Sequence, residues 1–162
     1  MIKNNYQNLF LSLILISGII LRIYNINFDD LWYDEIISFW VANPEHTTLE
    51  SFNIHDNIEI APPTFNFILK LLFELFSYDV NIGRYLPAIF SILTIITTFY
   101  LSKILIGNFF LLSTFLVSFN IFLISYAQQL RVYSLLIFFA SLSLIFFLKL
   151  LNEKIKKIDV TY

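Results

Sequence analysis

The chain has 162 residues, of which 58% are hydrophobic and 19% aromatic, and its mean hydropathy is +0.76. Soluble domains average about 45–50% apolar residues, so this composition excludes an ordinary soluble domain and predicts an integral membrane protein. The formal net charge is −2 and cysteine is absent, which excludes a disulfide framework and a thiolate metal site.

Four apolar runs approach or reach the length of about 20 residues that a membrane-spanning helix needs. The first run is expected to remain in the protein as a span, because Arg22-Ile23-Tyr24-Asn25 follows it where a signal peptide would have a small-x-small cleavage site. The predicted fold class is therefore an all-α integral membrane protein that forms a single membrane module. Its four predicted spans are residues 9–24, 85–106, 109–126 and 134–151.

A polar and acidic segment, residues 25–83, separates the first two spans and is predicted to be a long external loop with two interfacial helices. The first, at about 34–42, would rest its apolar side chains on the membrane surface. The second, at about 64–77, begins after Pro62-Pro63, a favourable helix start. It extends only about 20 Å, less than the roughly 30 Å of the bilayer core.

The orientation follows from the basic residues, because cytoplasmic loops are enriched in Lys and Arg. If the second interfacial helix does not cross, the N-terminus is cytoplasmic and most basic residues lie inside. The basic C-terminus is then an orientation signal and not an arm for nucleic acid, so no nucleic-acid partner is expected. The inside set is Lys3, Lys103, Lys149, Lys154, Lys156 and Lys157, and the outside set is Arg22, Lys70, Arg84 and Arg131.

The sharpest chemical signal is the pair Asp34-Glu35, within an acidic and aromatic stretch that begins at Asp29. Two interpretations stay open. Carboxylates suit the positive N-terminal end of a helix, so the pair can simply start the first interfacial helix. A carboxylate at a lipid interface with a raised pKa can also serve as a general base for an acceptor hydroxyl.

A series of short motifs extends this signal along the chain. They are Leu21-Arg22-Ile23-Tyr24, Asp30-Leu31-Trp32-Tyr33-Asp34-Glu35, Ala61-Pro62-Pro63, Arg84-Tyr85-Leu86-Pro87 and Tyr126-Ala127-Gln128-Gln129-Leu130-Arg131-Val132-Tyr133-Ser134. In this order and spacing, the series resembles the N-terminal part of the GT-C superfamily glycosyltransferases of the protein-mannosyltransferase and aminoarabinose-transferase type. The likeness extends from Leu21 to about Leu151.

The resemblance implies transfer of a sugar from a polyprenyl-phosphate donor to an acceptor hydroxyl or amine on the extracytoplasmic face of the cytoplasmic membrane, with inversion. By the same resemblance, Asp34 is the catalytic base with Glu35 beside it, and Arg131 holds the donor phosphate. Gln129, Tyr133 and Arg84 are the further candidate substrate-binding residues.

Each of these residues also has a plainer interpretation. Arg131 can be an interfacial arginine that extends to lipid headgroups, and Arg84 can be a membrane anchor. Trp32 and Tyr33 fit an aromatic belt at the membrane surface.

The chain departs from the family pattern at two positions. Ala61 stands before the Pro pair where the family commonly has His, and Gln129 stands where it commonly has an acidic residue. A divalent metal ion is the one cofactor considered, and Glu59 and His55, with Asp56 between them, are its candidate ligands. The plainer interpretation of His55 is an exposed loop histidine.

Two rival functions belong to other classes. The chain is expected to be such an enzyme or, since enzymes of this type usually have several hundred residues, its N-terminal fragment. The alternative is a non-catalytic membrane subunit or truncated remnant of such an enzyme. A small transporter fits less well, because no span carries an ionisable residue at its centre. A nucleotide-sugar donor is not expected, since the chain has only three glycines and no phosphate-binding Gly-rich loop.

Overall fold

The computed structural model describes the backbone of residues 2–159 and the side chains of residues 6–152. Every regular element in that range is a helix, which confirms the all-α fold. The elements are α1 (Ile2–Ile23), α2 (Tyr33–Val41), α3 (Thr48–Ile58), α4 (Thr64–Leu75), α5 (Val80–Ile106), the 3₁₀ turn η1 (Gly107–Phe109), α6 (Phe110–Ser118), α7 (Ile121–Gln128) and α8 (Tyr133–Asp159).

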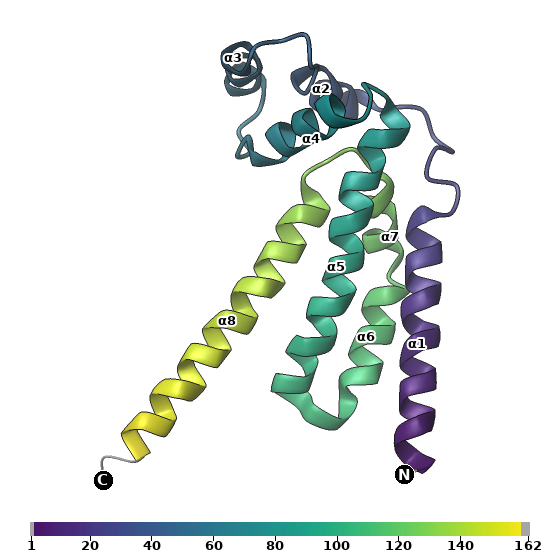
Figure 1. Cartoon of the computed structure of the whole chain (residues 1–162), viewed down its shortest axis with the longest axis vertical. Coiled ribbons are helices and arrows are strands. Elements are labelled where there is room, and N and C mark those ends of the chain that lie inside the picture. The colour runs from purple at the N-terminus through teal and green to yellow at the C-terminus, as the bar shows by residue number, and fades with distance from the viewer. Residues whose placement is uncertain (1, 160–162) are drawn as a thin grey trace.

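Three helical stretches are long and apolar enough to cross a membrane: Tyr6–Ile23, Val80–Ser118 and Tyr133–Asn152. The second of them contains both α5 and α6, which run in opposite directions on either side of η1 (Figure 1). The chain therefore has the multi-pass helices of a membrane protein. The side chains of Lys3, Lys154, Lys156 and Lys157, which belong to the predicted cytoplasmic set, lie outside the described residues.

Helix α5 is the centre of the bundle, since α1, α6, α7 and α8 all pack against it. The contact with α1 is close at Gly18, where a Cβ atom would lie 2.9 Å from Cδ1 of Ile95. Both termini lie at one end of the bundle, and α2, α3 and α4 gather at the other (Figure 1). The acidic segment between the first two spans thus forms a compact helical cap.

The cap has its own apolar core, which joins it to the bundle. Phe65, Leu69 and Phe73 form the buried face of α4, and they pack in one cluster with Leu86 of α5 and Leu130 of the segment before α8. Helix α4 lies across the bundle and not along it (Figure 1). The cap is therefore fixed to the end of α5 and to the loop between α7 and α8.

Helix α3 is missing from the sequence-based description of residues 25–83. Its start is a capping box: the Thr47 hydroxyl accepts a hydrogen bond from the Glu50 backbone N–H at 3.2 Å, and the Glu50 carboxylate accepts one from the Thr47 N–H at 2.6 Å. The Thr-x-x-Glu pattern is visible in the sequence and is the signal that would have predicted this helix.

The stretch 109–126, predicted as one continuous span, is divided in two. Helix α6 ends at Ser118 and α7 begins at Ile121, with the Asn120 side chain accepting a hydrogen bond from the Leu123 N–H at 3.1 Å. Arg22 of α1 donates to the carbonyls of Ser118 and Val117 at 3.0 and 3.1 Å. A break inside a bundle is tolerated when other groups satisfy the freed backbone, and Arg22 does so here.

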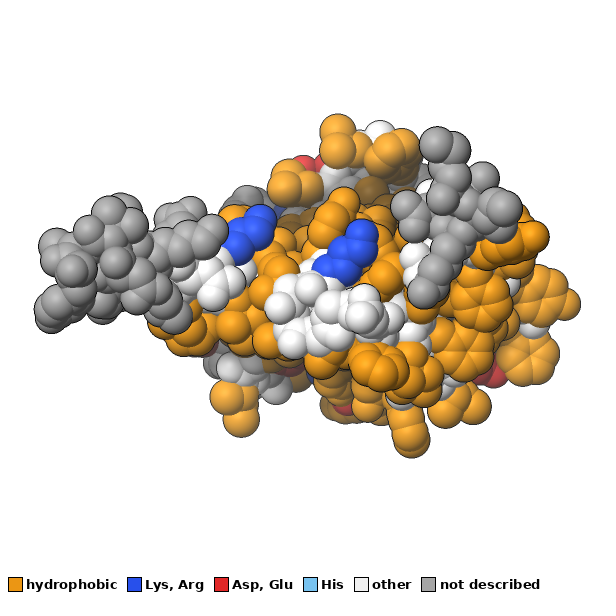
Figure 2. Space-filling model, turned by 90° about the horizontal axis from the view of Figure 1, so that it is seen from below, with side chains coloured by type: hydrophobic (Ala, Val, Ile, Leu, Met, Phe, Trp, Pro, Cys, Tyr) orange, Lys and Arg blue, Asp and Glu red, His pale blue; other side chains and the backbone are white. Residues whose placement is uncertain are grey.

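The surface of the bundle is strongly apolar. Large hydrophobic side chains of the long helices are exposed, for example Phe10 in α1, Ile104 in α5 and Phe146 in α8. Seen from the end where the termini lie, hydrophobic side chains surround the few basic ones (Figure 2). Such extensive exposed apolar area matches a lipid environment.

Candidate functional site

Asp34 and Glu35, adjacent at the start of α2, point into different surroundings, as successive residues on a helix do. Asp34 is half-buried and Glu35 is buried, with 1% of its surface exposed. In the part of the chain that the structure describes, the Asp34 carboxylate has no hydrogen-bond or ion-pair partner, although its backbone carbonyl accepts hydrogen bonds from Ser38 and Arg131. The Asp34 carboxylate is therefore not engaged by any other group among the described residues.

Glu35 forms a buried ion pair with Arg84 of α5, with Oε2 and Nη2 separated by 3.3 Å. The other carboxylate oxygen accepts a hydrogen bond of 2.5 Å from the Leu130 N–H. Arg84 also donates to the carbonyls of Ile26 and Asp29, at 3.1 and 2.8 Å. The pair thus joins α2, α5, the segment after α1 and the loop before α8, a set of contacts that gives both side chains a structural role.

Arg131 reaches the same end of α2 from the loop between α7 and α8. Its Nη1 donates to the Asp34 carbonyl at 3.0 Å and to the Ser38 hydroxyl at 3.2 Å. The same nitrogen forms a short ion pair with Glu59, which follows α3. Arg131 and Asp34 therefore lie together, as the predicted topology requires, although 97 residues separate them in the chain.

The electrostatic surroundings keep Arg131 charged. Burial by itself lowers the pKa of the guanidinium, but the hydrogen bond and negative charge of Glu59, with smaller contributions from Tyr133 and Asp34, raise the pKa above its ordinary value. The guanidinium carbon also lies 5.9 Å from the centre of the Tyr133 ring. Arg131 is thus a permanent cation beside the Asp34 carboxylate.

A tight turn separates Arg131 from Gln129, which was expected to act with it. The Arg131 N–H donates to the Gln129 carbonyl at 2.7 Å, closing a three-residue turn. Leu130, at the middle of the turn, is fully buried. Gln129 and Arg131 consequently line two different cavities.

The first cavity, named here the Asp34 cleft, is open and has a volume of about 370 Å³. Asp34, Glu59 and Arg131 supply its charged groups, and the remaining walls are mostly apolar. The lining includes Tyr33, Asp34, Ile37, Glu59, Ile60 and Arg131.

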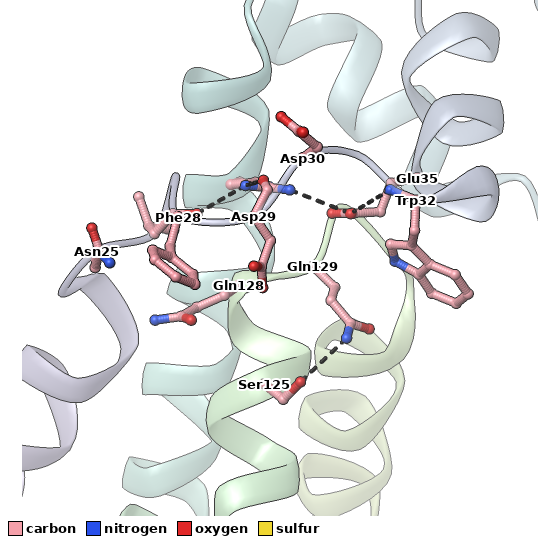
Figure 3. Close-up of a pocket in the computed structure, with 11 residues that line it drawn as sticks. Asn25, Phe28, Asp29, Asp30, Trp32, Glu35, Ser125, Gln128 and Gln129 are labelled. Carbon is pink, nitrogen blue, oxygen red and sulfur yellow. Dashed lines mark hydrogen bonds and ion pairs between the residues drawn. The ribbon is translucent and has the colours of Figure 1, made fainter.

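The second cavity, named here the Gln129 pocket, lies between the end of α1 and the end of α7 and has a volume of about 420 Å³ (Figure 3). It is more polar than the Asp34 cleft. The lining includes Asp29, Asp30, Trp32, Arg84, Gln128 and Gln129. The two cavities share the start of α2, since Asp34 lines one and Glu35 the other.

The candidate metal ligands lie together but are partly occupied. His55 Nε2 is 3.6 Å from Oε2 of Glu59, and Oε1 of Glu59 is paired with Arg131. No group of three or more His, Asp or Glu side chains that could hold a metal ion occurs among the described residues. Two donor atoms beside a guanidinium are a poor cation site, because Arg131 repels the ion. The metal therefore stays a prediction that chelation can test.

Two groups at the site were not expected from the sequence. Ser38, one turn after Asp34, accepts from Arg131, and its spacing of four residues along α2 is the signal that places it there. The Leu130 N–H donates a hydrogen bond to the Glu35 carboxylate, and a backbone contact of this kind is not visible in any residue pattern.

Comparison with protein-family models, with curated proteins and with solved structures finds no match to this chain.

Proposed function

We propose that the chain is a membrane glycosyltransferase, or the N-terminal module of one, that uses a polyprenyl-phosphate-linked sugar. The observation that carries the proposal is the Asp34 cleft, in which a carboxylate without a partner among the described residues lies beside a half-buried, positively charged arginine. Sugar transfer from a lipid phosphate needs these two groups, one for the acceptor proton and one for the leaving phosphate.

The chemistry assigns one role to each residue. The Asp34 carboxylate takes the proton of the acceptor hydroxyl or amine as that group attacks the anomeric carbon. The bond from the anomeric carbon to the phosphate oxygen breaks with inversion, and the phosphate leaves with the electron pair. Arg131 binds the phosphate oxygens and stabilises the charge that develops on them. Tyr133, whose ring lies beside the guanidinium, helps to orient it.

The proposed topology has four spans, the third of which is the broken pair α6–α7. The cap of α2, α3 and α4 then lies outside the cytoplasmic membrane, and both termini lie in the cytoplasm. Two features support this arrangement: the termini share one end of the bundle (Figure 1), and the predicted cytoplasmic set is rich in lysine. The donor reaches the cleft from the bilayer, and the acceptor is a glycan, a lipid or a protein.

The test is an Asp34→Asn substitution in the longest natural form of the protein, with transfer of a labelled sugar from the lipid donor as the measurement. We expect a loss of about 10²–10⁴-fold, the usual contribution of a general base. Glu45→Gln, which removes an exposed carboxylate of the cap, is the matched control and should leave transfer unchanged. Unaltered transfer by a normally expressed Asp34→Asn protein would refute the assignment of the base.

A non-catalytic membrane subunit is the second candidate, and the pairing of Arg131 with Glu59 favours it, because the phosphate-binding cation already has a partner. In that case neither the natural protein nor the Asp34→Asn variant transfers sugar, and the cap serves to bind another chain.

A further inference from the structure

The Gln129 pocket is a second polar cavity at the same end of the bundle as the Asp34 cleft. Its lining comes from four parts of the chain: the segment after α1, the start of α2, Arg84 of α5, and the end of α7 with Gln129 after it (Figure 3). Since the proposed reaction uses the groups of the Asp34 cleft, the Gln129 pocket needs an explanation of its own.

The charge of the pocket argues against an anionic ligand. Asp29, Asp30 and Glu35 contribute three carboxylates, and Arg84 contributes the single cation of the lining. The Arg84 charge is already paired with Glu35 at 3.3 Å and directed to two backbone carbonyls. A phosphate would meet the two exposed carboxylates without a free cation to offset them.

The hydrogen-bonding groups of the pocket suit a ligand with many hydroxyl groups. Within the described residues, the Asp29 and Asp30 carboxylates have no side-chain partner, and the amide nitrogens of Gln128 and Gln129 are used within the protein, which leaves their carbonyl oxygens. These groups accept hydrogen bonds. The Arg84 Nε is buried without a partner among the described residues, and the side chain is only 3% exposed.

An aromatic surface completes the lining. Trp32 borders the pocket with 45% of its surface exposed, and Figure 3 shows it among the side chains that line the pocket. A large exposed aromatic ring next to converging polar groups offers a flat apolar face for a ring-shaped polar ligand.

We infer that the Gln129 pocket binds a hydroxyl-rich sugar ring that carries no phosphate. Trp32 contacts the apolar face of the ring, and the Asp29, Asp30 and Gln129 oxygens accept hydrogen bonds from its hydroxyl groups. This site is separate from the Asp34 cleft, and the binding of the sugar does not depend on the proposed function.

The chain offers a direct optical measurement, because Trp32 and Trp40 are its two tryptophans. In a Trp40→Phe background, Trp32 is the sole tryptophan and reports on the pocket. The protein in lipid nanodiscs is titrated with the methyl glycosides of glucose, mannose and glucosamine. Glycerol and inorganic phosphate at equal concentration are the control titrants.

At least one glycoside should change the Trp32 emission in a saturable manner, and neither glycerol nor phosphate should do so. Gln129→Ala and Asp30→Asn should each raise the dissociation constant at least about fivefold, the effect of one lost hydrogen bond. Glu45→Gln, outside the pocket, should leave it unchanged. Asp30 lies on an exposed segment, so its substitution tests the pocket even if Gln129→Ala misfolds.

The outcomes separate the two proposals. A response to phosphate or glycerol equal to that of the glycosides, or no response to any glycoside, overturns the sugar pocket while Asp34→Asn still tests the enzyme. Sugar binding that persists in an Asp34→Asn protein whose transfer activity is unchanged supports the pocket and overturns the proposed base.

Discussion

Arg131 is held by Glu59 and by oxygen atoms of α2, so the residue proposed to bind phosphate has a carboxylate partner before any ligand arrives. A donor phosphate must displace Glu59 or share the guanidinium with it, and either event reduces the net free energy of binding. Glu59 is at the same time the carboxylate nearest to His55, at 3.6 Å. A single substitution of Glu59 can therefore show whether this carboxylate competes with phosphate for Arg131 or binds a metal ion.

Glu59→Gln keeps the shape of the side chain and a carbonyl that can accept from Arg131, but removes the competing charge. Under the proposed function, the KM for the lipid donor should fall several-fold, because about 1 kcal/mol of charge-assisted pairing is no longer lost on binding. Chelation with EDTA should not change the rate. Glu74→Gln, at a carboxylate 45% exposed and paired with Lys70, serves as the control. A loss of activity in Glu59→Gln, together with EDTA inhibition that added divalent ions reverse, would identify Glu59 as a metal ligand.

At the scale of the elements, local and distant interactions set different limits on prediction. The short helices α2 and α4 follow local patterns, an acidic first turn for one and a Pro pair for the other, and both were expected within two residues of their observed starts. The division of the 109–126 stretch depends on Arg22, which is 96 residues from Ser118. No local pattern contains that contact, although Asn120 lies within the apolar run and is a residue type that caps helices.

The contacts at the break between α6 and α7 should contribute measurably to the stability of the protein. Arg22→Met leaves the carbonyls of Val117 and Ser118 without their donor and should cost about 2–4 kcal/mol of stability, the penalty of two unsatisfied buried acceptors. Asn120→Ala removes only the cap of α7 and should cost about 1 kcal/mol. Ser12→Ala, which removes a single exposed hydrogen bond within α1, is the control. Thermal unfolding of the purified protein in detergent ranks the three. Equal effects of Arg22→Met and Ser12→Ala would contradict the role of Arg22.

The part of the candidate site that depends only on the order and direction of the helices was predictable from the sequence. Asp34 and Arg131 were expected on one face because two spans lie between Arg84 and Arg131, and the structure joins them through the Asp34 carbonyl. The turn at residues 129–131 was not predictable, because it is closed by a backbone contact, and it sends Gln129 to a separate pocket. The ion pair between Glu35 and Arg84 was also not predictable. Both residues belong to the motifs that suggested catalytic or binding roles, and only the fold shows that they pair with each other.

At the scale of the whole molecule, the number of spans determines on which side of the membrane the end of α8 lies. If α6 and α7 together cross the bilayer, the end of α8 lies on the same side as the turn between α5 and α6, and the cap lies on the opposite side. The chain has no cysteine, so single cysteines can be introduced without a background signal. Asn57, Asn108 and Asn152 are exposed positions in the cap, at the turn and near the end of α8.

Labelling of intact cells with a membrane-impermeant maleimide should modify Asn57→Cys without permeabilisation. Asn108→Cys and Asn152→Cys should react only after the membrane is opened, because both lie at the cytoplasmic end in a four-span arrangement. A three-span protein, in which α6 and α7 do not cross, would place Asn152→Cys on the opposite side from Asn108→Cys. Reaction of Asn108→Cys in intact cells with protection of Asn57→Cys would indicate the opposite orientation. The Asp34 cleft would then face the cytoplasm, which would contradict the proposed extracytoplasmic transfer.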